Sequence, residues 1–508
     1  MRLDGTTAAL ALLMALGTVL RVLVAQQPPF ADELATFWVV GRHDFFGVIE
    51  TVHSDAEITP PLYFVLAKFS TQIDSSREMM RLPSLAAGVA SIPLVYLVGR
   101  KTVGRRGALA AAALVTFSPF MVFYSTEARG YALMVALVLG STLALLNALE
   151  GRGRRWWLLY AVLSAGCMYT HYTAAFALAA QALWALWAHP DARRHVIGAN
   201  ALAAVLFLPW VTGLIADFRS PTTEILDALA PFDAFAVRTG LEHWLVGYPY
   251  RMVDLTEIPG VAALVAMAAG VLIAAAVAVG RYAGDRGPAS LARRRSLVLV
   301  IALALALPVG TALASALSIN LWGTRNLAAS LPAVALLVGA LVAVPRTRIS
   351  LAAALLLIGG FGIGAARMLD QENQRPDLDG IAAEIERQPA GTAVIDSGPL
   401  TPGPLTGLDF LIDGDYPVLR LGQPQQADHP FDVFDRVAPP SEVAARAARL
   451  AAGGRLIIVT QPRNGKPYDP FVGRVLRDLP PSFEIREIRR YPSMGVNTTL
   501  LLQDTRRG

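Results

Sequence analysis

Two adjoining stretches near the start of the chain decide the fold: TAALALLMALGTVLRVLVA at residues 7–25, and PPFADELATFWVVGRHDFFGVIETVHSDAEITPPLYF at residues 28–64. The first run is long enough to cross the hydrocarbon layer of a bilayer as a helix, which takes about 20 residues. The second stretch is rich in acids immediately beyond that run. Ionisable groups at a membrane boundary are costly, so acids gathered there indicate a functional site.

The composition of the whole chain points to a membrane protein. Of its 508 residues, 54% are hydrophobic and 16% are charged, and the mean hydropathy is +0.47. Soluble proteins carry about 25% charged residues. The single cysteine, Cys167, excludes an internal disulfide framework and a multi-cysteine metal cluster. The first apolar run ends without a small-residue cleavage site, so we interpret it as a retained span.

Apolar runs of spanning length recur along the first two thirds of the chain. We predict about 11 transmembrane helices, at residues 7–25, 80–99, 108–124, 131–148, 156–171, 173–188, 196–214, 259–280, 297–317, 327–344 and 349–366. Alternate loops are strongly basic, among them RKTVGRR (100–106) and DARRH (191–195). Because cytoplasmic loops retain positive charge, the prediction is a multi-pass cell-membrane protein with a cytoplasmic N-terminus. The basic pI of about 9.4 is then a topology signal that requires no nucleic acid.

The composition changes after the last apolar run, and residues 368–508 contain no further span. Short apolar strands alternate there with helical stretches, and the segment EIREIRRYPSMGVNTTLLLQ (484–503) alternates like a β-hairpin. The sequence predicts two domains: an all-α membrane domain, 1–367, with a first outer loop at 26–79, and a small extracytoplasmic α/β domain, 368–508.

This topology gathers the informative side chains on the outer face. The motifs there are DE (32–33), TPPLYFVLA (59–67), FSPFMVFYSTEARGYAL (117–133), YTHYTAAF (169–176) and TRNLAASLPAVALL (324–337). As an ordered set they resemble the GT-C superfamily of membrane glycosyltransferases. The resemblance is to the branch of protein O-mannosyltransferases and lipid A aminoarabinose transferases, and especially to actinobacterial members. It covers roughly residues 1–370, and RPDLDGIAAEIERQPAGTAVI (375–395) is similar to the segment after the last span in such proteins.

The resemblance implies a GT-C-type membrane domain and a glycosyltransferase that moves a sugar from a polyprenyl-phosphate donor to an extracytoplasmic acceptor hydroxyl, with inversion. The attacking hydroxyl must lose a proton to a carboxylate within hydrogen-bond reach. By resemblance that general base is Asp32. The local sequence alone equally allows Asp32 to be the N-cap of a helix that begins near Glu33.

The lipid phosphate that leaves must be stabilised by positive charge, and the planar fork of arginine suits a phosphate. The family carries an arginine at the position of Arg325, which makes this residue the first candidate, and Arg129 is the second. The alternative for Arg129 is a structural ion pair with Glu127. The lysine that the aminoarabinose branch has before its two prolines is replaced here by Thr59, so its role is not carried over.

The remaining substrate-binding candidates are Glu33, Glu57, Glu127, Tyr131, His171 and Tyr172. His171 also fits a purely structural role. No cofactor is certain; His53, Asp55, Glu57 and His171 are the residues that would hold a divalent metal if one is used.

The predicted sugar is of the mannose or arabinofuranose type, with mannose favoured by the resemblance, and a galactosamine-like donor stays open. The acceptor remains open among a cell-wall glycan, a glycolipid and a protein. Two other classes of function stay open: a transporter or flippase for polyprenyl lipids, which tends to show broken helices in repeated halves, and a noncatalytic anchor for the C-terminal domain.

Overall fold

A computed structural model of the chain describes residues 5–30, 32–54, 57–220, 231–250, 253–282, 288–317, 319–343, 348–397, 407–419, 421, 438–451, 453–463, 465–494 and 497–506. The chain forms two compact units. The helical unit comprises Met1–Ala25 and Arg42–Met368, and the sheet unit comprises Gln26–Gly41 and Leu369–Gly508. The sequence prediction kept residues 26–79 with the membrane domain, whereas in the structure residues 26–41 pack with the C-terminal residues.

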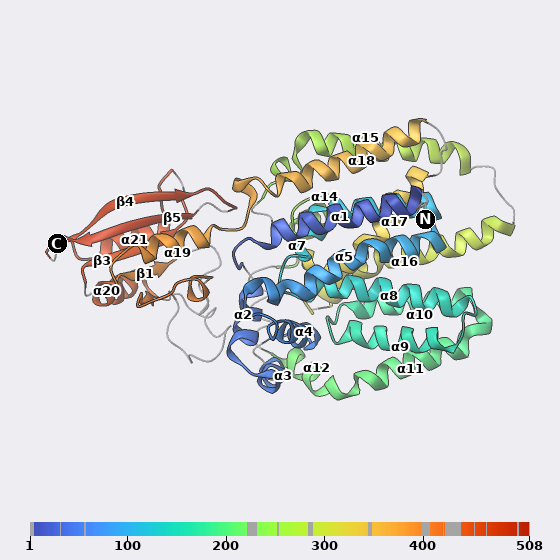
Figure 1. The fold of residues 1–508 in the computed structure, drawn as a ribbon, viewed down its shortest axis with the longest axis horizontal. Helices are drawn as coiled ribbons and strands as arrows, with labels where there is room; N and C mark the ends of the chain where they lie inside the picture. Colours follow the sequence, from blue (N-terminus) through green and yellow to red (C-terminus); the bar gives the residue numbers. More distant parts are fainter. Residues whose placement is uncertain are drawn as a thin grey trace. The chain divides into compact units, whose positions relative to one another are not determined.

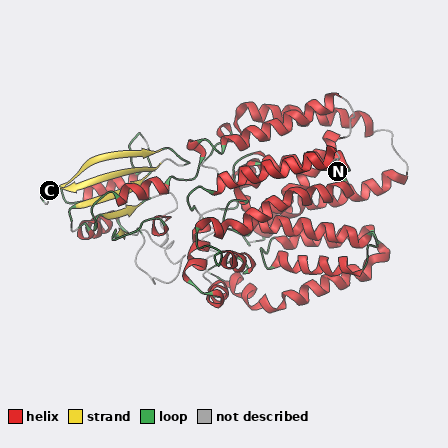
Figure 2. Cartoon of the chain, in the orientation of Figure 1, coloured by secondary structure: helices red, strands yellow, loops and turns green. Residues whose placement is uncertain are grey.

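The helical unit is built from long helices that run side by side (Figures 1 and 2). Its helices are α1 (Gly5–Ala25), α3 (Phe45–His53), α4 (Leu62–Ser70), α5 (Arg77–Thr102), α6 (Arg105–Phe117), α7 (Pro119–Tyr124), α8 (Tyr131–Leu149), α9 (Arg154–Met168), α10 (Ala174–Ala188), α11 (Arg193–Phe207), α12 (Val211–Arg219), α14 (Ala234–Val246), α15 (Val261–Tyr282), α16 (Pro288–Ala316), α17 (Leu331–Ala343) and α18 (Arg348–Arg367), with the short turns η1 (Pro190–Ala192), η2 (Leu208–Trp210), η3 (Thr256–Gly260) and η4 (Thr324–Ser330).

Every predicted apolar run falls on a helix or on consecutive helices, and eight segments within the described residues are long and apolar enough to cross a membrane. The helices at the third, fifth and sixth predicted runs are shorter. The third run is divided because Ser118 is extended and caps α7, with its hydroxyl accepting from the backbone N–H of Met121 at 3.3 Å. Pro119 follows at the first helical position, which suits a residue without an N–H. A multi-pass membrane protein is confirmed, and the count of 11 is not.

Small residues allow a close contact between α6 and α17. A Cβ placed on Gly339 of α17 would lie 2.3 Å from the carbonyl oxygen of Gly107 in α6. Membrane helices pack through such small residues because lipid supplies no hydrophobic drive for their association. This contact brings α17, whose preceding turn carries Arg325, against α6.

The sheet unit is an α/β domain, as predicted. Its elements are α2 (Glu33–Arg42), η5 (Gln371–Asn373), α19 (Leu378–Glu386), β1 (Ala393–Asp396), η6 (Gly407–Phe410), β2 (Val418–Leu419), α20 (Pro440–Leu450), β3 (Arg455–Thr460), α21 (Pro470–Asp478), β4 (Phe483–Tyr491) and β5 (Asn497–Asp504). The strand order is β2-β1-β3-β5-β4; β1 is parallel to β2 and β3, and β5 is antiparallel to β3 and β4. The predicted hairpin is therefore confirmed.

Alternation along the strands divides the core of this unit into two layers. Ile395 and Ile458 pack with α20 and α21 on one face of the sheet, whereas Val394 and Ile457 pack with α19 on the other. Successive strand residues point to opposite faces, so a strand covered on both sides is apolar throughout. This explains why LIIV (456–459) in β3 is continuously apolar.

Candidate functional site

Three turns of the helical unit meet and bring distant candidates together. They are residues 57–61 before α4, 125–130 between α7 and α8, and 169–173 between α9 and α10. The backbone N–H of Leu62 donates to the carbonyl of Tyr169 at 3.0 Å. A Cβ on Gly130 would lie 3.0 Å from Thr170 Cγ2, so the second turn also lies against the third.

A two-pronged ion pair joins the first two turns. Arg129 Nη1 lies 2.5 Å from Glu57 Oε2, and Nη2 lies 3.0 Å from Oε1. The side chains are only 7% and 2% exposed, which removes water that would weaken the attraction. The guanidinium also lies 5.6 Å from the centre of the Phe64 ring. Local sequence had offered only Glu127 as a partner for Arg129, whereas Glu57 is 72 residues away.

His171 lies in the third turn, within the electrostatic reach of two arginines. Burial, followed by the positive charges of Arg129 and Arg325, lowers the pKa of its imidazole to about 3. The backbone N–H of Thr173 donates to His171 Nδ1 at 3.4 Å, and the Thr173 hydroxyl lies 2.8 Å from the same atom. Because a backbone N–H can only donate, Nδ1 is an acceptor, and the proton of the neutral ring is on Nε2.

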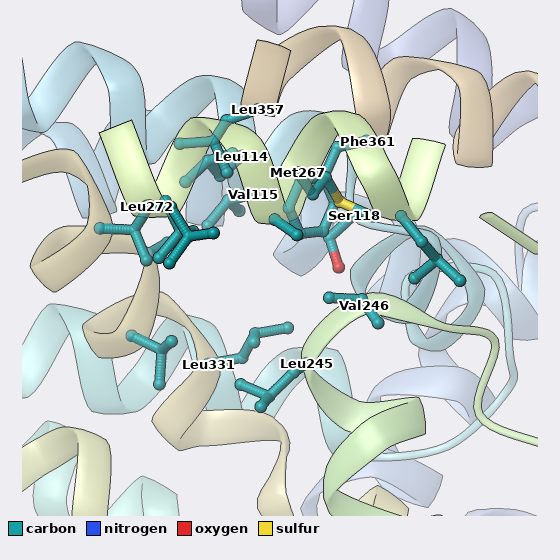
Figure 3. A pocket seen from close by; sticks show the side chains of 16 residues that line it. Leu114, Val115, Ser118, Leu245, Val246, Met267, Leu272, Leu331, Leu357 and Phe361 are labelled. Atoms are coloured by element: carbon teal, nitrogen blue, oxygen red, sulfur yellow. The ribbon is translucent and has the colours of Figure 1, made fainter. Parts of the chain in front are cut away.

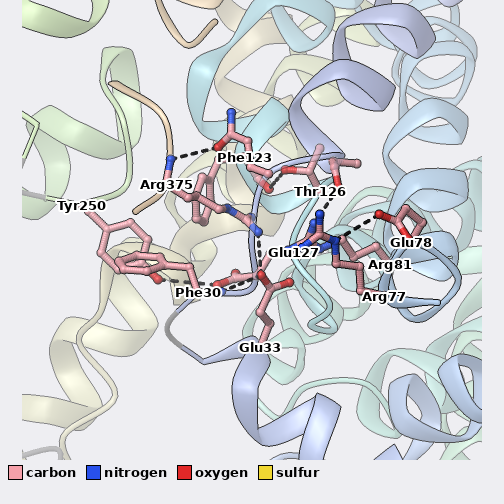
Figure 4. A network of polar contacts seen from close by, with 12 residues as sticks. Phe30, Glu33, Arg77, Glu78, Arg81, Phe123, Thr126, Glu127, Tyr250 and Arg375 are labelled. Atoms are coloured by element: carbon pink, nitrogen blue, oxygen red, sulfur yellow. Dashed lines mark hydrogen bonds and ion pairs between the residues drawn. The ribbon is translucent and has the colours of Figure 1, made fainter. Parts of the chain in front are cut away.

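Aromatic residues surround this point. The ring of Tyr131, the first residue of α8, lies 5.6 Å from the His171 ring and 4.9 Å from that of Tyr124. The hydroxyl of Tyr250 donates to Glu127 Oε1 at 3.5 Å, and Glu127 is buried (Figure 4). Tyr250 lies in the segment HWLVGYPYR (243–251), and no role was predicted for it from the sequence.

Tyr172 belongs to a separate hydrogen-bond group. Its hydroxyl donates to Asp217 of α12 and accepts from the indole N–H of Trp210 at 3.0 Å. Burial, together with the Asp217 charge, raises the pKa of Tyr172 above its ordinary value. These contacts describe a neutral tyrosine that ties the third turn to α12.

Arg325 is the second residue of η4, the turn that precedes α17. This turn packs against α8, which begins at Tyr131, and against α10, α14 and α16. The indole N–H of Trp322, just before η4, donates to the carbonyl of Ala236 in α14 at 3.1 Å. The side chain of Arg325 is half-buried.

Asp32 and Glu33 lie in the sheet unit, at the start of α2. Asp32 is half-buried and directly precedes the helix, as its capping alternative requires. Glu33 is fully buried and forms an ion pair of 2.6 Å with Arg375, which is equally inaccessible (Figure 4). The same Glu33 oxygen accepts from the backbone N–H of Phe30 at 2.9 Å. Arg375 begins the segment at residues 375–395, and no role was predicted for it from the sequence.

Two further contacts hold residues 26–41 within the sheet unit. The backbone N–H of Arg375 donates to the side-chain carbonyl of Gln27 at 3.1 Å. The rings of Phe37 and Phe410 lie 6.0 Å apart. The segment that carries Asp32 is therefore fixed by the C-terminal part of the chain.

The residues weighed as metal ligands do not form one group where the structure describes them. His53 Nε2 lies 3.1 Å from the hydroxyl of Thr212, and its ring packs edge-on against Trp210. Glu57 is paired with Arg129. Asp55 lies outside the described residues. Among the described residues, three or more His, Cys, Asp or Glu side chains gather nowhere in a group that could hold a metal ion.

An apolar cavity of about 540 Å³ opens within the helical unit. Figure 3 shows Leu245 and Val246 of α14 facing Met267 and Leu272 of α15 across it, with Leu331 beside them. Helices α6, α17 and α18 complete the walls, and Ser118 is the one polar residue of the lining. Leu331 directly follows η4, so the turn that begins beside Arg325 ends at this cavity.

Comparisons with known proteins agree with this architecture. Residues 59–212 match the family model described as dolichyl-phosphate-mannose-protein mannosyltransferase. The structure resembles ArnT from Cupriavidus metallidurans in the apo state, with a TM-score of 0.56, 13% identity and coverage of 98% of both chains. It resembles the undecaprenyl phosphate complex of ArnT with a TM-score of 0.53, 13% identity and 97% coverage of both chains.

A third similar structure is the oligosaccharyltransferase of Archaeoglobus fulgidus in complex with Zn and sulfate. The TM-score is 0.50 at 14% identity, and the match covers 89% of this chain and 67% of that one. A search of curated proteins gave no match. At these identities the likeness establishes the fold, so the resemblance to GT-C glycosyltransferases indicated by the motifs is confirmed at that level.

Proposed function

We propose that the chain is a membrane glycosyltransferase that moves one sugar from a polyprenyl-phosphate donor to an acceptor hydroxyl outside the cytoplasm. The sugar would be of the mannose or arabinofuranose type, transferred with inversion at the anomeric carbon. The acceptor would be a cell-wall glycan, a glycolipid or a protein. In this proposal the N-terminus is cytoplasmic and the C-terminal domain is extracytoplasmic.

The observation that carries the proposal is the continuity between a cation and an apolar cavity in the helical unit. A polyprenyl phosphate is a long apolar chain that ends in an anion. Arg325 is the second residue of η4, and Leu331 lines the cavity six residues later, a rise of about 12 Å at the ~2.0 Å per residue of a 3₁₀-helix. A lipid tail in the cavity would therefore leave its phosphate within reach of this turn. The ArnT complex shows that this fold accepts undecaprenyl phosphate in another protein.

The residues then take separate roles. Arg325 would bind the phosphate, and its charge would stabilise the lipid phosphate as the sugar leaves. Arg129 would add charge to the same pocket while Glu57 holds its guanidinium in place. Neutral His171 would donate its Nε2–H to a phosphate or sugar oxygen. Asp32 would take the proton of the attacking hydroxyl, a role that comes from the family resemblance and needs a functional test.

Four of the candidate residues contact neighbouring protein groups in the structure: Glu33, Glu127, Tyr131 and Tyr172. Glu33 fixes the segment that holds Asp32, and Tyr172 fixes the turn that holds His171. In this refined proposal these four residues shape the substrate pocket more than they touch the sugar.

The test uses purified protein in vesicles with polyprenyl phosphates that carry labelled mannose or arabinofuranose. We expect one donor to lose its label to an acceptor extract, with release of polyprenyl phosphate. Arg325→Gln should abolish this release. The matched control, Arg238→Gln, removes an arginine that is 74% exposed in the surface pair with Glu242 and should retain activity. A label that crosses the bilayer still attached to lipid would favour a flippase and refute the proposal.

A further inference from the structure

A second apolar groove lies at the opposite ends of the helices that line the first cavity. Its volume is about 580 Å³, and its walls come from α1, α6, α17 and α18. The residues that carry the following reasoning are Leu12, Arg106, Ala110, Val342, Ser350 and Leu351. Leu12 is 59% exposed and Leu351 is 62% exposed, so the groove is open at the exposed surface of the helical unit.

The two cavities use different halves of the same helices. In α17 the first cavity is lined by residues from Leu331 to Val338, whereas the groove is lined by the last two residues, Val342 and Ala343. On α17 the nearest lining residues, Val338 and Val342, are four positions apart, about 6 Å along an α-helix, and on α18 the two linings adjoin at Leu357 and Ile358 without sharing a residue. The groove is therefore distinct from the cavity assigned to the donor and lies towards the other side of the membrane.

A cation lies at the mouth of this groove. Arg106 is the second residue of α6, its side chain is exposed, and the described part of the chain gives it no ion-pair partner. Its neighbour Arg105 is engaged elsewhere, donating to the hydroxyl of Thr6 at 3.2 Å. Ser350, in the first turn of α18, adds a hydroxyl to the lining. An arginine above an apolar slot matches a molecule with one anionic head and an apolar tail.

Other basic residues lie close to Arg106 in the chain, at the end of α5 and the start of α6. Arg100, Lys101, Arg105 and Arg106 all fall within seven residues. Basic residues beside membrane helices attract the anionic lipids of the leaflet they face, and basic pockets between helices bind anionic head groups. The first turns of α6 and α18 also present their N-terminal ends here, which favours negative charge.

We propose that this groove binds an anionic phospholipid from the leaflet at the basic ends of the helices. The phosphate lies against Arg106 and Ser350, and one acyl chain lies along Leu12, Ala110 and Val342. Because α6, α17 and α18 also line the first cavity, the bound lipid would hold together the helices that shape the donor site. This inference does not depend on the identity of the sugar or on the activity itself.

The test measures lipid retention by the purified full-length chain with native mass spectrometry after mild delipidation. Phosphatidylglycerol is compared with phosphatidylcholine of the same acyl chains. We expect about fivefold preference for the anionic lipid, the factor for one arginine at such a surface. Arg106→Gln should remove the preference. Arg105→Gln, the matched control one residue away, should keep it. Ala110→Trp should fill the slot and lower the retention of both lipids.

Three outcomes would overturn the proposal. Equal retention of the two lipids would mean that the groove is a nonspecific acyl slot. Equal effects of Arg106→Gln and Arg105→Gln would mean a diffuse surface charge without a site. Displacement of phosphatidylglycerol by polyprenyl phosphate at equal concentration would assign the groove to the carrier lipid instead.

Discussion

Arg375→Met tests whether the C-terminal domain holds the segment that carries Asp32. The substitution removes the guanidinium that pairs with the Glu33 carboxylate; both side chains of the pair are fully inaccessible and lie 2.6 Å apart. Breaking a buried ion pair from one side costs about 3–5 kcal/mol. The bond from Phe30 N–H to Glu33 remains and offsets a small part of this cost. Local unfolding of residues 26–41 should therefore become at least about 10²-fold more frequent.

Hydrogen exchange of peptides covering residues 27–41 in the full-length protein measures this opening directly. The double variant Glu33→Gln with Arg375→Met removes both charges and should recover most of the lost protection, because a neutral pair of similar volume is well tolerated. Sugar transfer should fall in Arg375→Met and return in the double variant. The matched control is Arg486→Gln, whose partner Glu484 is 56% exposed and whose own side chain is 49% exposed.

Unchanged protection in Arg375→Met would refute the reasoning, and so would a double variant that loses as much as the two single variants combined. If Arg375→Met lost protection but kept full transfer activity, the Glu33–Arg375 pair would be a structural feature with no connection to the role of Asp32.

Three further changes have defined outcomes. The pKa of His171 is about 3 in the folded protein and near 6.5 when unfolded, so the unfolded state binds more protons below pH 6.5. The free energy of unfolding should therefore fall between pH 6.5 and pH 3, by up to about 1.4 kcal/mol per pH unit. Unfolding curves of His171→Gln should lack this contribution. Tyr172→Phe removes the bond to buried Asp217 and should lower the free energy of unfolding by about 1.5–3 kcal/mol; an unchanged midpoint in denaturant contradicts this. Ala268→Trp fills the first cavity and should reduce transfer from long polyprenyl donors more than from short ones, whereas Ala262→Trp, on the same helix outside the lining, should affect neither.

Periodicity along the chain predicted most of the fold. Residues 131–148 and 349–366 are apolar all round because they lie in lipid or among other helices, and both appear as single long helices. The hairpin of β4 and β5 was readable because two strand-like segments flank the helix-breaking Pro492. The third run was not readable as two helices, because the bend depends on one capping hydroxyl at Ser118.

The two buried ion pairs, one in each unit, could not be predicted from the sequence, because they join residues that are far apart in the chain. Arg129 binds Glu57 across 72 residues, and Arg375 binds Glu33 across 342. Nothing local to Glu33 distinguishes a buried partner of an arginine from a substrate contact. The apolar cavity was equally hidden, since a leucine that lines a cavity has the same hydropathy as one that faces lipid. The motifs predicted which turns hold the candidate residues, and the fold decides which of their side chains meet.

The most direct measurement of the central claim is single-turnover transfer from the labelled polyprenyl-phosphate sugar by Asp32→Asn, in parallel with Glu50→Gln. Glu50 is an exposed acid of the same acidic stretch, so the two variants differ in position and not in the kind of charge removed. We predict that Asp32→Asn binds the donor but leaves the label on the lipid, while Glu50→Gln transfers it at the wild-type rate. Wild-type transfer by Asp32→Asn would contradict the account.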